Sequence, residues 1–132
     1  MQGTLNQKVG TVFGAVYVLV GLAGFLVTGL TGFAAPEGDL LIVFEVNPLH
    51  NLVHIGIGAA LILAARSSAS ASRTMNVVIG ATYLLVGLVG FVMMDEEFNI
   101  LALNMADNWL HIVSAALLLF VGLTNRTDTR TT

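Results

Sequence analysis

Four long runs of apolar residues dominate the chain, and short polar segments separate them. The runs cover approximately residues 9–30, 40–65, 75–94 and 100–123. Each is close to the ~20 residues that an α-helix needs to cross the hydrocarbon core of a bilayer. None shows the polar face that a helix of this length carries in a soluble protein. Because unpaired backbone groups are costly in lipid, the pattern predicts four membrane-spanning α-helices.

The composition supports a membrane protein and excludes several classes of function. Of the 132 residues, 56% are hydrophobic and only 10% are charged, whereas roughly 25% of an ordinary soluble domain is charged. So small a body cannot bury this apolar excess internally, so the expected partner is the lipid bilayer. The absence of cysteine excludes disulfides, thiolate metal sites and cysteine nucleophiles. Without a basic cluster, nucleic acid is not an expected partner.

The charged residues indicate how the helices are oriented. All basic residues lie near the N-terminus, in the middle loop or near the C-terminus, whereas acidic residues fill the first and third loops. Short loops rich in Lys and Arg stay in the cytoplasm. We therefore expect a plasma-membrane protein with both termini cytoplasmic and both hairpin loops extracytoplasmic. The basic residues are Lys8, Arg66, Arg73, Arg126 and Arg130, and the acidic loop residues are Glu37, Asp39, Glu45, Asp95, Glu96 and Glu97.

The chain also contains an internal repeat. Shifted by 66 positions, residues 12–25 match residues 78–91 at ten of fourteen positions. Shifted by 57 positions, the start of the second run matches the start of the fourth. The sequence therefore predicts one all-α domain, residues 1–132, which is an up-down-up-down four-helix bundle formed by tandem duplication of a helical hairpin. Repeat 1 covers about 9–66 and repeat 2 about 75–123, and a flexible polar linker over 67–74 joins them.

The matched glycines and tyrosines of the repeat have a structural interpretation. Small residues let helices approach closely within a membrane, so the glycines are expected at helix contacts. Tyr17 and Tyr83 fall near the middle of their spans, where each hydroxyl is expected to form a hydrogen bond with a neighbouring helix. The matched glycines are Gly21 with Gly87 and Gly24 with Gly90.

Polar residues gather where the second and fourth runs begin. Asn47 is a suitable N-cap, and Pro48 fits the first helical turn. Asn51 and His54 continue this polar stripe on one helix face. Polar residues in membrane helices usually face the bundle interior, so the stripe and its repeat should point inward, with their histidines at equal depth. The repeated stripe consists of Asn104, Asn108 and His111.

The two copies differ at one position of the stripe, where His50 in the first corresponds to Asp107 in the second. His50 lies four positions before His54, and Asp107 lies four positions before His111. That spacing places each pair on one helix face and is able to bind a metal. Neutral imidazole binds iron, zinc or copper. The candidate metal ligands are therefore His50, His54, Asp107 and His111.

Three interpretations of this cluster are open from the sequence. In the first, Asn47, Asn51, Asn104 and Asn108 form a hydrogen-bonded structural network with the histidines. In the second, the histidines bind a transition metal, or His54 and His111 ligate a haem between facing helices. In the third, this end of the bundle forms a cleft for lipid or peptide. A protein without any cofactor fits the residues equally well.

No catalytic constellation accompanies the cluster. Asp107, His111 and Ser114 stack along one helix and so lack the convergent geometry of a seryl triad. No charged residue interrupts the middle of a span, although ion and proton pathways usually require one. We therefore expect a non-catalytic membrane protein, either a homo-oligomer or an accessory subunit of a larger membrane complex. The alternative is a metal- or haem-binding membrane protein.

Two runs of residues resemble a known family. The first is Asn47-Pro48-Leu49-His50-Asn51-Leu52-Val53-His54, followed by a Gly-rich apolar helix, and the second is Asn108-Trp109-Leu110-His111. They are similar to domain-of-unknown-function family 4383, which comprises small four-helix bacterial membrane proteins common in actinobacteria. The resemblance covers roughly residues 9–123. It implies a four-helix membrane fold and carries no established activity.

Overall fold

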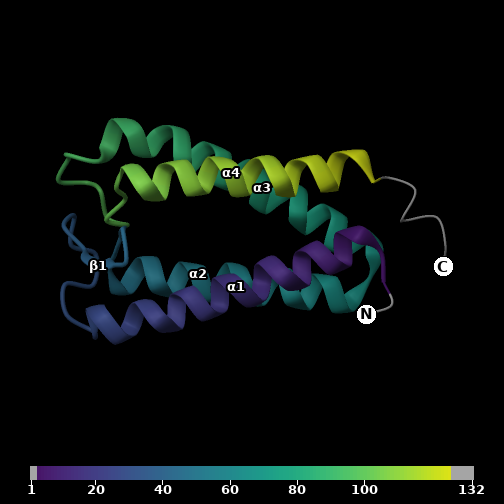
Figure 1. The fold of residues 1–132 in the computed structure, drawn as a ribbon, viewed down its shortest axis with the longest axis horizontal. Coiled ribbons are helices and arrows are strands. Elements are labelled where there is room, and N and C mark those ends of the chain that lie inside the picture. The colour runs from purple at the N-terminus through teal and green to yellow at the C-terminus, as the bar shows by residue number, and fades with distance from the viewer. Residues whose placement is uncertain (1–2, 126–132) are drawn as a thin grey trace.

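The computed structural model describes residues 3–125, which form long α-helices and one short β-hairpin (Figure 1). All four helices are long and apolar enough to cross a membrane. The prediction of an all-α, four-helix, multi-pass membrane protein is therefore confirmed. In chain order the elements are α1 (Leu5–Thr28), β1 (Asp39–Leu41), β2 (Phe44–Val46), α2 (Pro48–Ser67), α3 (Ala69–Met93) and α4 (Met105–Thr124).

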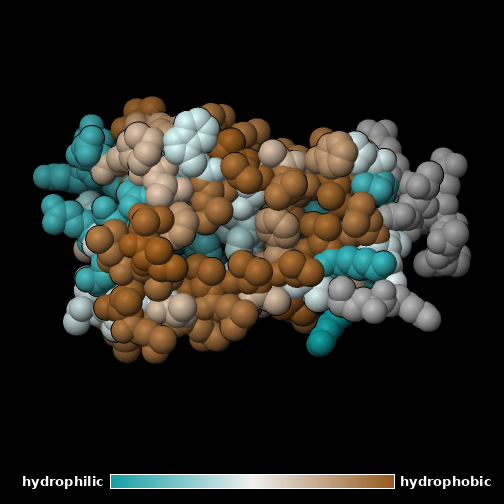
Figure 2. All heavy atoms as spheres, in the orientation of Figure 1, coloured by the Kyte–Doolittle hydropathy of each residue, from teal (hydrophilic) through white to brown (hydrophobic). Residues whose placement is uncertain are grey.

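The helices form two antiparallel hairpins that lie side by side. α1 packs mainly against α2, and α3 packs mainly against α4. We call the end that carries segments 29–47 and 94–104 the loop end, and the opposite end, where α1 and α3 begin, the terminal end (Figure 1). Figure 2 shows an apolar flank between hydrophilic residues at the loop end and further hydrophilic residues at the terminal end. This is the distribution that a lipid environment favours.

Two of the helix boundaries differ from the hydropathy pattern. The second apolar run was expected to be helical from about residue 40, but residues 39–46 form the antiparallel β1–β2 hairpin, with Ile42 at φ 65° in its turn. The fourth run was expected to begin near residue 100, but Ala102 also has a positive φ of 51° and α4 begins at Met105. Hydropathy does not locate these starts, because most of the residues that precede each cap are themselves apolar.

Capping asparagines set both starts, and Asn47 is the N-cap that the sequence predicted for α2. The Asn47 side chain accepts a hydrogen bond from the His50 backbone N–H at 2.8 Å. The Asn104 side chain accepts one from the Asp107 N–H at 3.0 Å, and the Asp107 carboxylate accepts one from the Asn104 N–H at 3.1 Å. Each cap satisfies backbone donors that have no partner within the helix.

The expected flexible linker over 67–74 is wrong. α2 continues to Ser67 and α3 begins at Ala69, so Ser68 is the one non-helical residue between them. Ser68 has an extended backbone, its N–H donates to the Ala64 carbonyl, and its hydroxyl accepts from the Ala71 N–H at 3.0 Å. A polar Ser/Ala sequence is thus compatible with helix when one serine serves as the cap between two helices.

Asparagines also join the two hairpins at the terminal end, which the sequence reading missed. The Asn76 amide of α3 donates to the Asn6 backbone and side-chain oxygens of α1 at 3.0 and 3.1 Å. The Asn6 amide donates to the Asn125 carbonyl after α4 at 3.3 Å. Both Asn6 and Asn76 are fully buried. Polar contacts therefore hold α1, α3 and the end of α4 together at this end.

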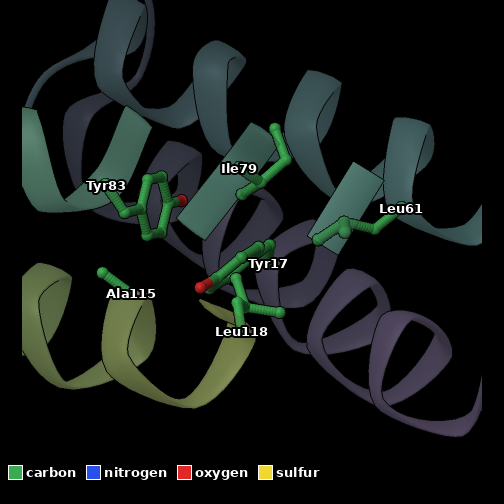
Figure 3. Packing of buried hydrophobic residues seen from close by; sticks show 6 residues of the cluster. All are labelled: Tyr17, Leu61, Ile79, Tyr83, Ala115 and Leu118. Carbon is green, nitrogen blue, oxygen red and sulfur yellow. The ribbon is translucent and has the colours of Figure 1, made fainter. Parts of the chain in front are cut away.

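The apolar core lies in the middle of the bundle, and all four helices contribute to it (Figure 3). It is small, because most large apolar side chains point outward, for example Leu19, Leu26 and Phe120. Such an exterior is suited to lipid, where packing of small residues rather than water exclusion drives helix association. The core residues are Tyr17, Leu61, Ile79, Tyr83, Ala115 and Leu118.

Two glycines show why small residues are needed within each hairpin. A Cβ at Gly24 of α1 would overlap the Asn51 side chain of α2, and a Cβ at Gly90 of α3 would overlap the Asn108 side chain of α4. The packing role predicted for these glycines is confirmed. The same contact occurs once in each hairpin, at positions related by the repeat, which agrees with a duplicated hairpin. The duplication itself stays a prediction.

We expect Gly24→Ala and Gly90→Ala each to destabilise the protein by about 1–3 kcal/mol, because overpacking forces buried neighbours to shift. The measurement is the free energy of unfolding in mixed detergent micelles. Gly56→Ala is the matched control, since a Cβ there meets nothing within 4 Å. That variant should be neutral or slightly stabilising, as alanine is the better helix former. Equal stability of all three variants would contradict the packing argument.

Candidate functional site: a buried histidine cluster

Three histidines meet inside the bundle below the loop end. His50 and His54 come from α2, and His111 comes from α4. They are only 3%, 7% and 4% exposed. One possible ligand atom from each ring lies within 4.8 Å of those from the other two. The chain thus places three imidazoles, which are potential metal ligands, in one small volume that is screened from lipid and water.

The local sequence explains this convergence. His54 and His111 each lie seven residues after a capping asparagine, Asn47 or Asn104, so the two caps set the depth of the two rings. Their ring centroids are 6.2 Å apart. His50 lies one turn before His54 on α2, and the two Nε2 atoms are 2.9 Å apart. The inward direction and matched depth predicted for the histidines agree with this arrangement.

Most of the hydrogen-bonding capacity of the rings is unused. The His50–His54 contact is the one hydrogen bond that their ring nitrogens make within residues 3–125, and the Nδ1 atoms of His50, His54 and His111 have no partner. Backbone groups of Glu45 and Leu101 lie beside the His50 ring but complete no hydrogen bond with its Nδ1. Buried polar groups are normally satisfied, so this cluster requires an explanation.

The predicted hydrogen-bonded network of asparagines and histidines is not found among the described residues. The Asn51 amide donates to the Thr28 hydroxyl at 3.0 Å, and neither side-chain polar atom of Asn108 has a partner. Thr28 corresponds to Met94 in the repeat, so the second hairpin lacks the hydroxyl that Asn51 uses. Asn47 and Asn104 act as helix caps instead. Among the described residues, the asparagines therefore organise the helices around the histidines without a hydrogen bond to the rings.

Asp107, the fourth candidate ligand, lies outside the histidine group. Its Oδ2 accepts hydrogen bonds from the backbone N–H groups of Asn104, at 3.1 Å, and Glu45, at 3.2 Å. The group of convergent ligand atoms found in residues 3–125 contains only the three histidines. Asp107 thus completes the cap of α4 and fixes the β1–β2 hairpin to it. The i, i+4 spacing to His111 did not distinguish this capping role from a ligand role.

A cavity of about 50 Å³ adjoins the three rings. It has room for an ion and one small molecule, since a water molecule takes about 30 Å³. Sites for large organic cofactors are much bigger, about 300–1,000 Å³. Besides the histidines, the cavity is lined by Tyr83, Thr82 and the apolar residues Val53, Ile57, Val86 and Leu101.

Two tyrosines pack against the histidines in equivalent ways, which sequence reasoning missed. The Tyr17 ring meets His54 edge-on at 5.6 Å, and the Tyr83 ring meets His111 edge-on at 4.8 Å. The hydrogen bonds predicted for their hydroxyls stay a prediction, because neither oxygen has a partner at full hydrogen-bond geometry. The hydroxyls of Tyr17, Tyr83 and Ser114 are nonetheless neighbours. The only available signal was the shared repeat position of the two tyrosines.

The loop end is closed by two hydrogen bonds that we call the reciprocal clasp. The Asn47 amide donates to the Ile100 carbonyl at 2.8 Å, and the Asn104 amide donates to the Val43 carbonyl at 2.9 Å. The two donors, Asn47 and Asn104, are 57 positions apart, and so are the two acceptors, Val43 and Ile100. Each hairpin therefore donates an equivalent hydrogen bond to the other. Leu101, next to one acceptor, forms part of the wall of the histidine cavity. The clasp therefore holds that wall in place.

A wider cleft, about 660 Å³, opens at the loop end. Its lining includes carboxylates from both hairpins, so it does not resemble an apolar lipid site. The acidic residues of the lining are Glu37, Glu45, Asp95, Glu96 and Glu97.

Together, the apolar exterior, the four spans and the buried polar cluster define a small multi-pass membrane protein of the four-helix type. Residues 7–124 match the family described as Domain of unknown function (DUF4383), and the chain belongs to this family. The family resemblance seen in the sequence is thereby confirmed. Comparison with curated proteins and with solved structures gave no match.

Because of the reciprocal clasp, we expect a substitution in one hairpin to increase the mobility of the loop in the other hairpin. Asn47→Ser retains a capping hydroxyl but is too short to reach Ile100, so it should speed amide hydrogen exchange in segment 99–103. Asn104→Ser should instead speed exchange in segment 39–46. Loss of one such hydrogen bond costs about 0.5–1.5 kcal/mol, so local exchange should rise by up to about tenfold. Exchange that increased only in the loop of the mutated hairpin would contradict the clasp.

Proposed function

We propose that this protein binds one transition-metal ion within its membrane-spanning bundle, through His50, His54 and His111. The observation that carries the proposal is the convergence of three buried imidazoles, with ligand atoms within 4.8 Å of one another. Imidazole suits zinc, copper, iron and nickel. The proposal retains three of the four ligands expected from the sequence and gives Asp107 a capping role.

The distances support an ion at this position. Two nitrogens that bind one ion tetrahedrally at 2.0–2.1 Å are about 3.3 Å apart. The His50 and His54 Nε2 atoms are 2.9 Å apart. The two rings would therefore need to move apart only slightly for both nitrogens to bind the same ion. His111 needs a side-chain shift of about 1–2 Å to complete the set. Coordination through these Nε2 atoms would replace the hydrogen bond between His50 and His54.

The same geometry favours a bare ion over haem. A macrocycle between His54 and His111 requires a large cavity, and the space beside these rings is about 50 Å³. The centroids of His54 and His111 are only 6.2 Å apart, and the His50 ring packs against both, at 4.7 and 6.1 Å. A homo-oligomer or a larger membrane complex stays a prediction from the sequence.

For the orientation, we propose the plasma membrane, with the loop end outside and the terminal end in the cytoplasm. Lys8, Arg66 and Arg73 lie at or near the terminal end, whereas the acidic residues of the wider cleft lie at the loop end. Basic residues near short loops are retained in the cytoplasm. The histidine cluster would then lie just below the outer surface of the membrane.

Metal content tests the proposed function. Protein purified in detergent should hold about one equivalent of transition metal by elemental analysis, and a chelator should lower its unfolding temperature. At an ion concentration 100 times the Kd, binding contributes about 2.7 kcal/mol of stability. His54→Gln and His111→Gln should abolish metal binding.

Asp107→Asn is the matched control and should retain the metal, because its side chain still offers an acceptor oxygen to the cap. A folded wild-type protein that binds no zinc, copper, iron, nickel or cobalt would refute the proposal. Loss of folding in both His→Gln variants, without any metal signal in the wild type, would assign the cluster a purely structural role.

The absence of native cysteines makes the orientation directly measurable. Glu96→Cys at the loop end should react with a membrane-impermeant maleimide in intact cells. Ser70→Cys near the terminal end should react only after the membrane is permeabilised. Both positions are solvent-facing in the bundle, so they are matched for accessibility. The reverse pattern would invert the topology.

A further inference from the structure

We infer that a groove along α3, open to the lipid side of the bundle, holds one acyl chain of a phospholipid whose headgroup ends in a primary ammonium. The ammonium lies against the carboxylates of the turn that follows α3, which are those of Asp95, Glu96 and Glu97. This inference does not rest on the proposed metal site, because none of the three histidines lines the groove.

The groove is formed by α3 and by the loop that leads to α4, and its volume is about 250 Å³. Leu85 and Val89 on α3 and Ile100 on the loop are 62%, 41% and 51% exposed, so the groove opens on the outside of the bundle. At the roughly 30 Å³ that a water-sized group occupies, it has room for about eight methylene groups. The other lining residues are Val86, Met93, Asn99, Leu101 and Leu103.

The one polar side chain of this lining is fully used within the loop. Asn99 is 2% exposed, and its amide donates to the Met94 and Leu103 carbonyls at 3.2 and 3.0 Å. Its side-chain oxygen accepts a hydrogen bond from the Leu103 N–H at 2.9 Å. Asn99 therefore fixes the shape of the loop wall, and the groove presents apolar side chains to its occupant. A hydrocarbon chain gains dispersion contacts with such a surface and leaves no polar group unpaired.

The groove continues along the seam between α3 and α2 for the depth of one leaflet. Val86 and Leu101 line both the groove and the cavity beside the histidines, whose wall includes Thr82. From Met93 to Thr82 the helix rises about 16 Å, at 1.5 Å per residue. Half of the hydrocarbon core of a bilayer is about 15 Å thick. An acyl chain that enters at the loop end therefore matches the groove in length.

A group of acidic residues lies directly at the loop end of the groove. The Glu96 N–H donates to the Met93 carbonyl at 3.1 Å, and the Asn99 N–H donates to the Glu96 carbonyl at 3.0 Å. Met93 and Asn99 both line the groove, so the turn is fastened over its end. Asp95, Glu96 and Glu97 are all exposed. The apolar groove and the carboxylates thus form one amphipathic surface.

The charge of this turn selects the headgroup. Lys8, Arg66 and Arg73 lie at or near the terminal end, so no basic side chain within residues 3–125 is available to these carboxylates. A primary ammonium donates charge-assisted hydrogen bonds to carboxylates. A phosphoglycerol headgroup carries negative charge alone and is repelled.

The first hairpin has a structure at this level that the second lacks. β1 packs against α1, whereas residues 94–104 form no strand that packs against α3. The two shifts that relate the repeats, 66 and 57 positions, differ by nine, so the first loop is nine residues longer. The shorter second loop leaves this side of α3 open to lipid.

The experiment uses the full-length protein in detergent, with bound lipid counted by native mass spectrometry. Phosphatidylethanolamine and phosphatidylglycerol with identical acyl chains are titrated separately. The wild type should bind one phosphatidylethanolamine about threefold to tenfold more tightly than phosphatidylglycerol. Asp95→Asn, Glu96→Gln and Glu97→Gln, combined in one variant, should bring the two affinities within about twofold of each other, because the charge is removed and the groove is kept.

A second pair of variants tests the groove. Val89→Trp should weaken the binding of both lipids by about tenfold, because the indole takes the volume of the acyl chain. Val27→Trp is the matched control and should bind both lipids as the wild type does. Val27 is 44% exposed against 41% for Val89, lies on α1 near the loop end, and does not line the groove.

The outcomes test the groove and the headgroup separately. If the wild type retains neither lipid, the site is refuted, and if it binds both lipids equally, the headgroup assignment is refuted. If Val89→Trp binds both lipids as tightly as the wild type, or Val27→Trp weakens binding equally, the groove is not where the acyl chain binds. None of these measurements reads the metal content, so the lipid site and the metal site can fail independently.

Discussion

The structure depends on two asparagine side chains that each serve both hairpins. The oxygens of Asn47 and Asn104 cap α2 and α4, and their amides donate to the loop of the opposite hairpin. Helix starts carry unpaired N–H groups, which are costly at the edge of a membrane. The caps fix where each helix begins, and helical geometry then fixes the depth of His54 and His111. The loop end, the histidine cluster and its cavity wall follow from these four bonds.

The apolar exterior has a second effect on the site. Large side chains face lipid, and small residues occupy the helix contacts, so little volume remains for polar groups inside. The histidines, Tyr17 and Tyr83 therefore share one layer and contact one another. In a bundle of this kind, polar residues that cannot face lipid are forced into proximity, which creates a ligand set without any binding motif in the sequence.

Much of the fold was accessible from the sequence because its signals are local or periodic. The length of the apolar runs predicted the four spans, and the Asn47-Pro48 pair predicted the start of α2. The internal repeat predicted that His54 and His111 lie at equal depth. The β1–β2 hairpin and the Ser68 connection were missed, since hydropathy and Ser content say nothing about a positive φ or a shared cap. The partner of Asp107 is a backbone group 62 residues away, which no spacing rule reveals. Asp107 lies three residues after Asn104, which is the spacing of a capping box and indicated a capping role instead of a ligand role.

The hairpins are joined covalently through Ser68 alone, yet hydrogen bonds connect them at both ends, through the reciprocal clasp and through Asn6 and Asn76. The peptide link is therefore not what keeps the halves in register. Each two-span half supplies donors or acceptors to these inter-hairpin bonds, and an ion held by α2 and α4 would also bridge the halves. Two similar hairpins within one chain therefore resemble a pseudo-dimer. Its halves differ at one position of the stripe, His50 against Asp107, a difference that the identical subunits of a true homodimer could not have.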